Sequence, residues 1–179
     1  MEKPRQLTLM ADVDHVLRAT RQLPAGYETR ETTNRDKNLL ASIYFAAYNR
    51  EIAGDLEAAQ DEIERAFDGE YGPLDLEASP IAAHQGLPVG SVMTVTEAPW
   101  DDTPSGPFII EVMVHPDHRR RGLAEHLMLA TARKLAASGR ITVALRVMSD
   151  NKKALALYEK LGFVTWNADA SWGRQNRGR

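Results

Sequence analysis

Residues 115–128 read HPDHRRRGLAEHLM: three consecutive arginines, one glycine, and then an apolar pattern with helical spacing. A helix usually begins with acidic side chains, because its dipole is positive at the N-terminus. Arg119, Arg120 and Arg121 instead add positive charge at this end. The first-turn N–H groups of a helix have no partner within it, so they can cradle an anion. The stretch therefore predicts a pyrophosphate site, although a solvated basic patch would have a similar composition.

Gly122 and Ala124 fit the same prediction, because small residues let a ligand approach the backbone of the first turn. The stretch matches neither of two common phosphate loops. The chain contains no G-x-x-x-x-G-K-[ST] and no G-x-G-x-x-G, so it lacks the Walker loop and the dinucleotide fingerprint.

The segments around this stretch alternate between strand and helix patterns. The run FIIEVMV at 108–114 is almost continuously apolar, as expected of a strand buried on both faces. The helix after Gly122 should end near Ala137, where Ser138 and Gly139 provide a cap. A strand at 141–147, a helix at 152–161 and a strand from Phe163 should follow. The order is β-α-β-α-β.

The first hundred residues are less regular. They predict a short strand at 6–10, a helix at 12–21, a strand at 27–33, helices at 37–51 and 56–67, and a hairpin from SPIAAHQG and VGSVMTVTE turning at 86–88. A loop with three prolines covers 98–107, and the basic tail at 174–179 should be frayed. We expect one mixed α/β domain over residues 1–179.

The composition excludes several classes of protein. The 179 residues are 43% hydrophobic and 26% charged, contain no cysteine, and carry a net charge of −3. Disulfides and thiolate chemistry are therefore excluded, and the charge argues against a general nucleic-acid binder. No apolar run approaches the roughly 18 residues of a membrane span, and the N-terminus lacks the apolar core of a signal peptide. These features predict a cytoplasmic protein.

A second motif, NKKALALYEKLGF at 151–163, gives the first one a context. Together the two motifs resemble the GCN5-related N-acetyltransferase (GNAT) family. That family carries R/Q-x-x-G-x-G/A, matched by Arg119, Gly122 and Ala124. It also carries N-x-x-A-x-x-x-Y-x-K-x-G-F, and the matching residues here are Asn151, Ala154, Tyr158, Lys160, Gly162 and Phe163. The resemblance is strong over residues 108–163. It implies a central mixed, mostly antiparallel sheet of about six or seven strands, flanked by about four helices.

The resemblance also implies a reaction and its residues. Acetyl-CoA would be the co-substrate, no metal would be needed, and the acceptor would be a primary amine of a small molecule or peptide. The backbone of Val112, Met113 and Val114 would hold the pantetheine arm and polarise the acetyl carbonyl. The residues expected around the pyrophosphate are Arg119, Arg120, Arg121, Gly122, Leu123 and Ala124. Asn151 would bind the pantetheine arm or only cap its helix, and Tyr158 would be the general acid or only a core residue.

Glu111 is the candidate general base, since several family members carry a carboxylate on this strand. Strand alternation predicts Glu111 and Met113 on one face, with Ile110, Val112 and Val114 on the other. The alternative is a structural ion pair with Arg146. His115 and His118 are expected to be exposed loop residues rather than metal ligands.

Acceptor specificity should come from the first half of the chain, through the helices at 37–67 and the loop at 98–107. Acidic residues in these segments suggest a cationic acceptor, but solubility explains them equally well. They are Asp61, Glu62, Glu64, Asp68, Glu70, Asp101 and Asp102. Five aromatic residues could line a pocket or belong to the core: Tyr27, Tyr44, Tyr48, Tyr71 and Trp100.

Two other functional classes stay open at this point. The chain could bind acetyl-CoA as a sensor or regulatory module without catalysis. It could also bind nucleic acid through its arginines, and the net charge counts against this. Homodimers are common in the family that the chain resembles, but the sequence does not fix the oligomeric state.

Overall fold

The computed structural model describes residues 3–48 and 50–168, and the basic tail predicted to be frayed lies outside them. The strands are β1 (Gln6–Asp12), β2 (Tyr27–Glu31), β3 (Pro80–His84), β4 (Leu87–Val95), β5 (Phe108–Val114), β6 (Thr142–Met148) and β7 (Val164–Thr165). The α-helices are α1 (Val13–Val16), α2 (Lys37–Ala47), α3 (Arg50–Ala53), α4 (Leu56–Phe67), α5 (Leu123–Ala137) and α6 (Lys152–Lys160).

The seven strands form one sheet in the order β2-β3-β4-β5-β6-β1-β7. Every neighbouring pair is antiparallel except β5 and β6, which run parallel. This confirms the predicted mixed, mostly antiparallel sheet. Of the α-helices described, α1 and α3 have only four residues each, so four longer helices flank the sheet, as predicted.

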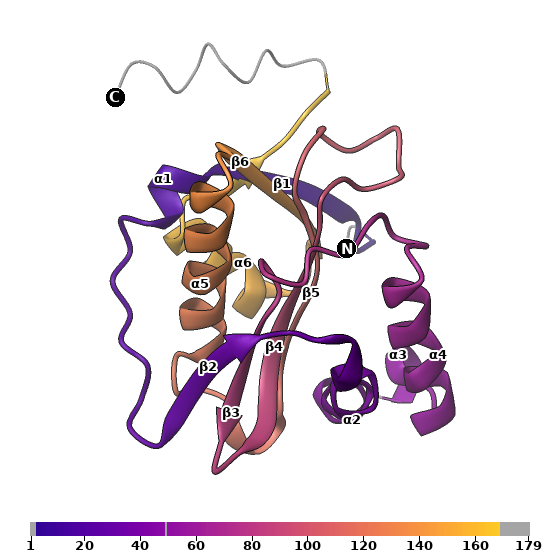
Figure 1. Cartoon of the computed structure of the whole chain (residues 1–179). Helices are drawn as coiled ribbons and strands as arrows, with labels where there is room; N and C mark the ends of the chain where they lie inside the picture. The colour runs from indigo at the N-terminus through magenta and orange to yellow at the C-terminus, as the bar shows by residue number, and fades with distance from the viewer. Residues whose placement is uncertain (1–2, 49, 169–179) are drawn as a thin grey trace.

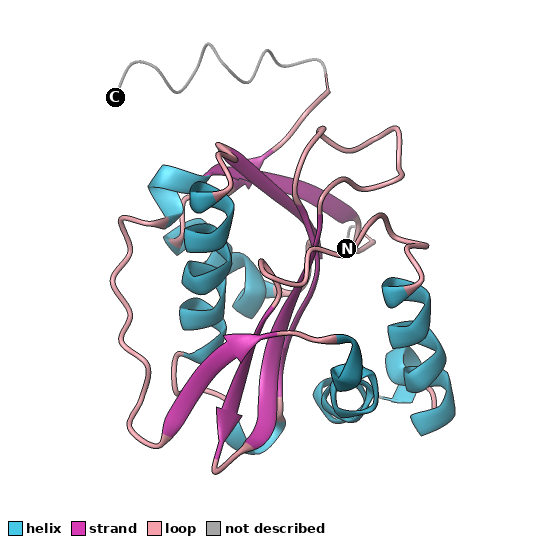
Figure 2. Ribbon diagram, in the orientation of Figure 1, coloured by secondary structure: helices cyan, strands magenta, loops and turns pink. Residues whose placement is uncertain are grey.

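Helices cover both faces of the sheet (Figures 1 and 2). On one face, α1, α5 and α6 pack over a large apolar cluster that includes Val13, Leu127 and Leu161. On the other, α2 and α4 enclose a second cluster around Leu40 and Ile63. The strands between two such layers are apolar on both sides, which explains the almost continuous apolar run of β5.

Local signals place α2 and α4. Thr33 and Asp36 form a capping box, and the guanidinium of Arg30 binds the Asp36 carboxylate through two hydrogen bonds of 2.9 and 2.6 Å. This pairing lowers the pKa of Asp36 to about 2, so the carboxylate stays charged. Asp55 caps α4 by accepting a hydrogen bond from Ala58 N, and the predicted range of this helix is confirmed.

Several predicted boundaries differ from the structure. β1 extends to Asp12 rather than ending at residue 10, and β2 ends at Glu31 rather than at residue 33. The helix expected over 12–21 is limited to Val13–Val16, and the one expected over 37–51 ends at Ala47, with α3 separate. The hairpin turns at Gln85 and Gly86, one residue or two before the expected place. Both residues have positive φ, 53° and 78°, the backbone that a tight hairpin turn requires, so β4 already begins at Leu87.

Candidate active site

The sheet opens between β5 and β6. The two parallel strands pair only at Phe108 with Ala144 and at Ile109 with Leu145. Beyond these residues β5 pairs with β4 alone, whereas β6 continues along β1 as far as Met148. The second half of β5 therefore has a free edge in the middle of the sheet, where an extended ligand could pair with its backbone.

The register determines which backbone groups lie along this edge. His115 N donates to Val89 O at 2.8 Å, so in an antiparallel ladder residues 111, 113 and 115 bond to β4. Val112 and Val114, the alternate residues, direct their N–H and C=O groups toward the gap. Met113 directs its backbone toward β4 and buries its side chain under α2 and α4. Of the three residues expected along the pantetheine arm, Val112 thus offers a free N–H and a free C=O group, and Val114 offers a free N–H, because its carbonyl accepts from Arg119 Nε.

The loop between β5 and α5 has the expected cradle. Arg120 and Gly122 both have positive φ, 58° and 78°, and α5 begins at Leu123 with no side-chain cap. Within the described residues, the backbone N–H groups of 120–125 donate to no other group. This run includes the first-turn groups of Leu123 and Ala124. Six unpaired donors at the positive end of a fifteen-residue helix are the groups that an anion site requires.

The three arginines of the loop are not equivalent. Arg119 Nε donates to Val114 O at 3.1 Å and its Nη2 donates to Ala47 O, so this side chain ties the loop to β5 and to the end of α2. Arg120 and Arg121 are exposed and remain available to a ligand.

A fourth arginine, which the sequence analysis did not single out, lies at the same site. Arg21 Nη2 donates to Arg121 O at 3.0 Å from the segment between α1 and β2. Its guanidinium lies so close over Gly122 that a Cβ on this glycine would be 2.0 Å from Arg21 Nε. No sequence signal identified Arg21, because about a hundred residues separate it from the loop.

The two family motifs touch through an ion pair. Lys160 Nζ lies 2.8 Å from Oε1 of Glu125, a carboxylate that is otherwise buried in α5. Asn151 caps α6 by accepting a hydrogen bond from Ala154 N at 3.2 Å, as one of its two expected roles requires. Its side-chain NH₂ group is exposed and donates to no described residue. This leaves the amide free to bind a ligand as well.

Glu111 lies at an irregularity of β5. Met93 pairs with Glu111 and Thr94 pairs with Ile109, so Ile110 is an extra residue in a β-bulge. The strict alternation predicted for this strand is therefore wrong for Ile110. Its side chain packs on the α2 and α4 side together with Met113, whereas Val112 and Val114 pack on the α5 side. The bulge orients Ile110 and Glu111 to the same side of the sheet.

The partner of Glu111 is a tyrosine rather than Arg146. Tyr48 Oη, just past the end of α2, donates to Glu111 Oε2 at 2.5 Å, while Arg146 forms an ion pair with Asp102. Burial raises the pKa of Glu111 to about 7, against the lowering effect of the Tyr48 hydrogen bond, and the nearby Glu62 adds to the increase. A carboxylate with this pKa can exchange a proton near neutral pH.

Tyr158 approaches the same gap from the opposite face of the sheet. It is 7% exposed on α6, and its ring lies 5.7 Å from that of Phe163. Burial raises the pKa of Tyr158, and the negative charge of Glu111 raises it further, so the phenol stays protonated. The pKa of Tyr48 is raised by burial and by both Glu111 and Tyr158. The three side chains are thus electrostatically coupled around the opening between β5 and β6.

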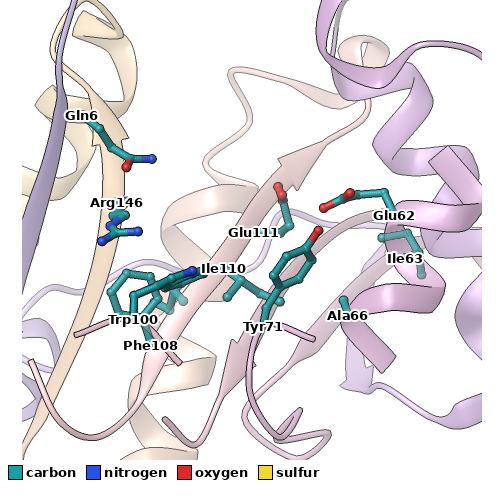
Figure 3. Close-up of a pocket in the computed structure, with 11 residues that line it drawn as sticks. Gln6, Glu62, Ile63, Ala66, Tyr71, Trp100, Phe108, Ile110, Glu111 and Arg146 are labelled. Carbon is teal, nitrogen blue, oxygen red and sulfur yellow. The ribbon is translucent and has the colours of Figure 1, made fainter. Parts of the chain in front are cut away.

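A pocket of about 270 Å³ lies beside this cluster on the α4 side of the sheet (Figure 3). Apolar residues of β5 and α4 form its floor, and polar side chains stand at two ends. Of the acidic residues considered as a sign of a cationic acceptor, Glu62 lines the pocket, and Asp102 pairs with Arg146 beside it. Tyr71 and Trp100, two of the five aromatic candidates, also line it.

The histidines near the anion loop have partners that the sequence analysis did not predict. His118 Nδ1 and Tyr27 Oη form a hydrogen bond of 2.8 Å, and the ring of His84 lies 5.3 Å from that of His118. The expectation of a simple exposed loop residue is therefore wrong for His118, which is half-buried. Burial lowers the pKa of His118, and the nearby His84 and His115 lower it further.

Comparison with known proteins extends the sequence motifs to most of the chain. The model of the acetyltransferase (GNAT) family matches residues 37–163. Two mycothiol acetyltransferases are similar. The protein of Gordonia bronchialis is 45% identical over 41% of this chain and 23% of its own length. The protein of Rhodococcus erythropolis is 31% identical over 72% of this chain and 42% of its own length. The chain therefore covers less than half of either relative.

Solved structures share the fold. The PaiA N-acetyltransferase of Thermoplasma acidophilum, solved in complex with coenzyme A, superposes with a TM-score of 0.59. The match covers 81% of this chain and 94% of that one at 16% sequence identity. In residues 3–48 and 50–168, no helix has the length and apolar character that a bilayer span requires.

Proposed function

Because the chain belongs to the GNAT family of acetyltransferases, we propose that it transfers an acetyl group from acetyl-CoA to a primary amine by direct attack. The observation that carries the proposal is the opening between β5 and β6. A free strand edge runs from a cradle of unpaired N–H groups to the half-buried carboxylate of Glu111 and the buried phenol of Tyr158. Acetyl transfer needs these parts: an anchor for the cofactor, a base and an acid.

The described residues fit the chemical groups of acetyl-CoA. When bound, this co-substrate supplies an activated acetyl thioester. The unpaired N–H groups of 120–125 and the exposed Arg120 and Arg121 suit a pyrophosphate. The free N–H and C=O groups of Val112 and the free N–H of Val114 suit the amides of a pantetheine arm. An N–H group at this edge can also stabilise the negative charge that develops on a carbonyl oxygen. Asn151 offers one further donor.

Glu111 is proposed to take the proton that the amine must lose before it attacks. An alkylammonium group has a pKa of about 10.4, so only a small fraction is neutral at pH 7. A carboxylate in water is a weak base, but burial raises the pKa of Glu111 to about 7, which makes proton transfer to it less unfavourable. Tyr48 fixes the carboxylate through its hydrogen bond of 2.5 Å. The proton moves to Glu111 directly or through water.

Tyr158 is proposed to donate a proton to the leaving sulfur. The leaving sulfur resembles that of cysteine, whose thiol has a pKa of about 8.5. It leaves more readily as a thiol than as a thiolate. The phenol is neutral over the whole physiological range, because burial and Glu111 both raise its pKa. Tyr158 and Glu111 lie on opposite faces of the sheet, so one can donate a proton to the sulfur while the other takes a proton from the amine.

Two measurements test the proposal. Calorimetry should detect binding of acetyl-CoA, and a thiol-release assay with a panel of primary amines should detect turnover. The names of the relatives support acetyl transfer as the reaction. The panel of amines identifies the acceptor of this chain. Tight binding of acetyl-CoA without release of thiol on any acceptor would contradict the proposal and indicate a binding module instead.

A further inference from the structure

The pocket next to Glu111 has two chemically different ends (Figure 3). The carboxyl groups of Glu111 and Glu62 stand at one end, near the hydroxyl of Tyr71. Arg146 of β6 and Gln6 of β1 stand at the other. The wall between them is apolar. A ligand that fills the pocket would therefore meet acidic groups at one end and cationic or amide donors at the other.

Arg146 is held in place and still has free donors. Its guanidinium stacks over the ring of Trp100 at 4.8 Å, and its Nη2 donates to Asp102. Trp100 is itself fixed by an edge contact with Phe108, their ring centres 5.8 Å apart. The Arg146 side chain is only 17% exposed, whereas Asp102 is 81% exposed. Among the described residues no group accepts from Arg146 Nε or Nη1, so part of its fork remains available.

We propose that the acceptor is a small apolar amino acid, whose amine faces Glu111 and whose carboxylate binds Arg146 and Gln6. This inference rests on the proposed function and names its substrate class. A guanidinium fork matches the two oxygens of a carboxylate. The wall of Phe108 and Ile110 suits an apolar side chain, and a pocket of about 270 Å³ has room for a molecule of this size. A polyamine, by contrast, would bring a second ammonium group against Arg146.

A set of three acceptors with one apolar body separates the carboxylate from the amine: leucine, leucinamide and 3-methylbutylamine. The amino group of the amide is less basic than that of leucine, and that of the alkylamine is more basic. A preference for leucine over both cannot therefore come from amine basicity. We expect kcat/KM for leucine to exceed both others by at least tenfold, which steady-state kinetics at a fixed acetyl-CoA concentration measures.

Two variants separate recognition from a merely structural role. In Arg146→Gln, the ratio of kcat/KM for leucine to that for 3-methylbutylamine should fall toward one. In Asp102→Asn, the ratio should rise severalfold, because the guanidinium loses its competing carboxylate. If the Arg146–Asp102 pair only stabilises the loop at 98–107, both variants will lower kcat/KM for all three acceptors by the same factor. Arg140→Gln is the matched control, since Arg140 is exposed and outside the pocket.

The outcomes distinguish the two proposals. Turnover of all three amines with equal kcat/KM, or an unchanged ratio in Arg146→Gln, overturns the inference and leaves the acetyltransferase function standing. Binding of acetyl-CoA without turnover of any amine overturns the function and the inference together. A preference for leucine that disappears in Arg146→Gln and survives in Arg140→Gln supports the inference.

Discussion

The two faces of the sheet present different kinds of chemical group to a ligand. On the α5 face, the groups that would hold acetyl-CoA are backbone donors: the free edge at Val112 and Val114, and the N–H groups of 120–125. On the α2 and α4 face, the pocket is lined by side chains from elements far apart in the sequence, from Gln6 to Arg146. One face is built from main chain and the other from side chains.

This difference explains which face leaves a motif in the sequence. A backbone cradle constrains only a few residue types, such as Gly122, whose positive φ of 78° favours glycine. These requirements recur at a fixed spacing. A pocket of side chains can be rebuilt with other residues for each acceptor, so it leaves no fixed spacing. Glu111 and Tyr158 lie on opposite faces of the sheet, on either side of the opening between β5 and β6.

The largest effect should come from Glu111→Gln, which tests the proposed base beside the opening between β5 and β6. We expect kcat to fall by about 10²- to 10⁴-fold, the usual contribution of a general base. In the unaltered protein, activity should rise with pH through about 7, because Glu111 must lose its proton to act and its pKa lies there. A pH profile of kcat/KM should show this rise, and the variant should lack it.

Glu64→Gln is the control for this variant, since Glu64 is exposed on α4 and does not line the pocket. Glutamine at 111 can still accept the hydrogen bond of Tyr48, so the fold should be retained. An unchanged rate and pH profile would exclude Glu111 as the base. The only proposed catalytic group would then be Tyr158, on the α5 face.

Tyr158→Phe probes the other side of the opening. We expect kcat to fall by about 10²-fold, the lower end for a general acid, because the leaving thiolate is already fairly stable. The phenyl ring keeps the packing against Phe163, so acetyl-CoA affinity measured by calorimetry should change little. A loss of affinity and thermal stability with an unchanged kcat would show that Tyr158 is only a core residue.

Much of the fold is predictable from periodicity. The exact ranges of α4 and β5 follow from apolar spacing, and those of α5 follow from Gly122 and the cap at its end. The bulge at Ile110 is not predictable, because it depends on the register between two strands. The shortening of the helix predicted at 12–21 also depends on tertiary packing, which local propensity does not contain.

The candidate site, like the fold, is predictable from the sequence only in part. The residues identified from motifs lie around the opening, but their partners come from distant parts of the chain. Tyr48 is 63 residues from Glu111, and Arg21 is 100 residues from Arg121. Nothing in a single sequence connects such pairs. The motifs therefore predict where the candidate site lies, whereas the contacts that set the pKa values of its residues appear only in the folded chain.

Gly122→Ala tests whether main-chain recognition needs this glycine. A Cβ would strain a residue with φ of 78° and would displace the guanidinium of Arg21, the end of a flexible side chain. We expect Kd for acetyl-CoA to rise about tenfold, equivalent to about 1.4 kcal/mol, with kcat at saturation changed much less. Gly139→Ala, at another positive φ of 75°, is the control for backbone strain alone. Equal effects of both variants on affinity would contradict a special role for Gly122.

The smallest effect should come from Arg21→Gln, which tests whether side chains also contribute on the main-chain face. Arg21 lies over the start of α5 and is exposed, so its attraction for a phosphate is screened by water. We expect kcat/KM for acetyl-CoA to fall about two- to fivefold. Acetyl-pantetheine lacks the pyrophosphate, so its kcat/KM should stay the same. Arg18→Gln, at an exposed position nearby, controls for net charge. If Arg21→Gln slowed both donors equally, the guanidinium would act on the loop alone and the face would recognise its ligand by main chain only.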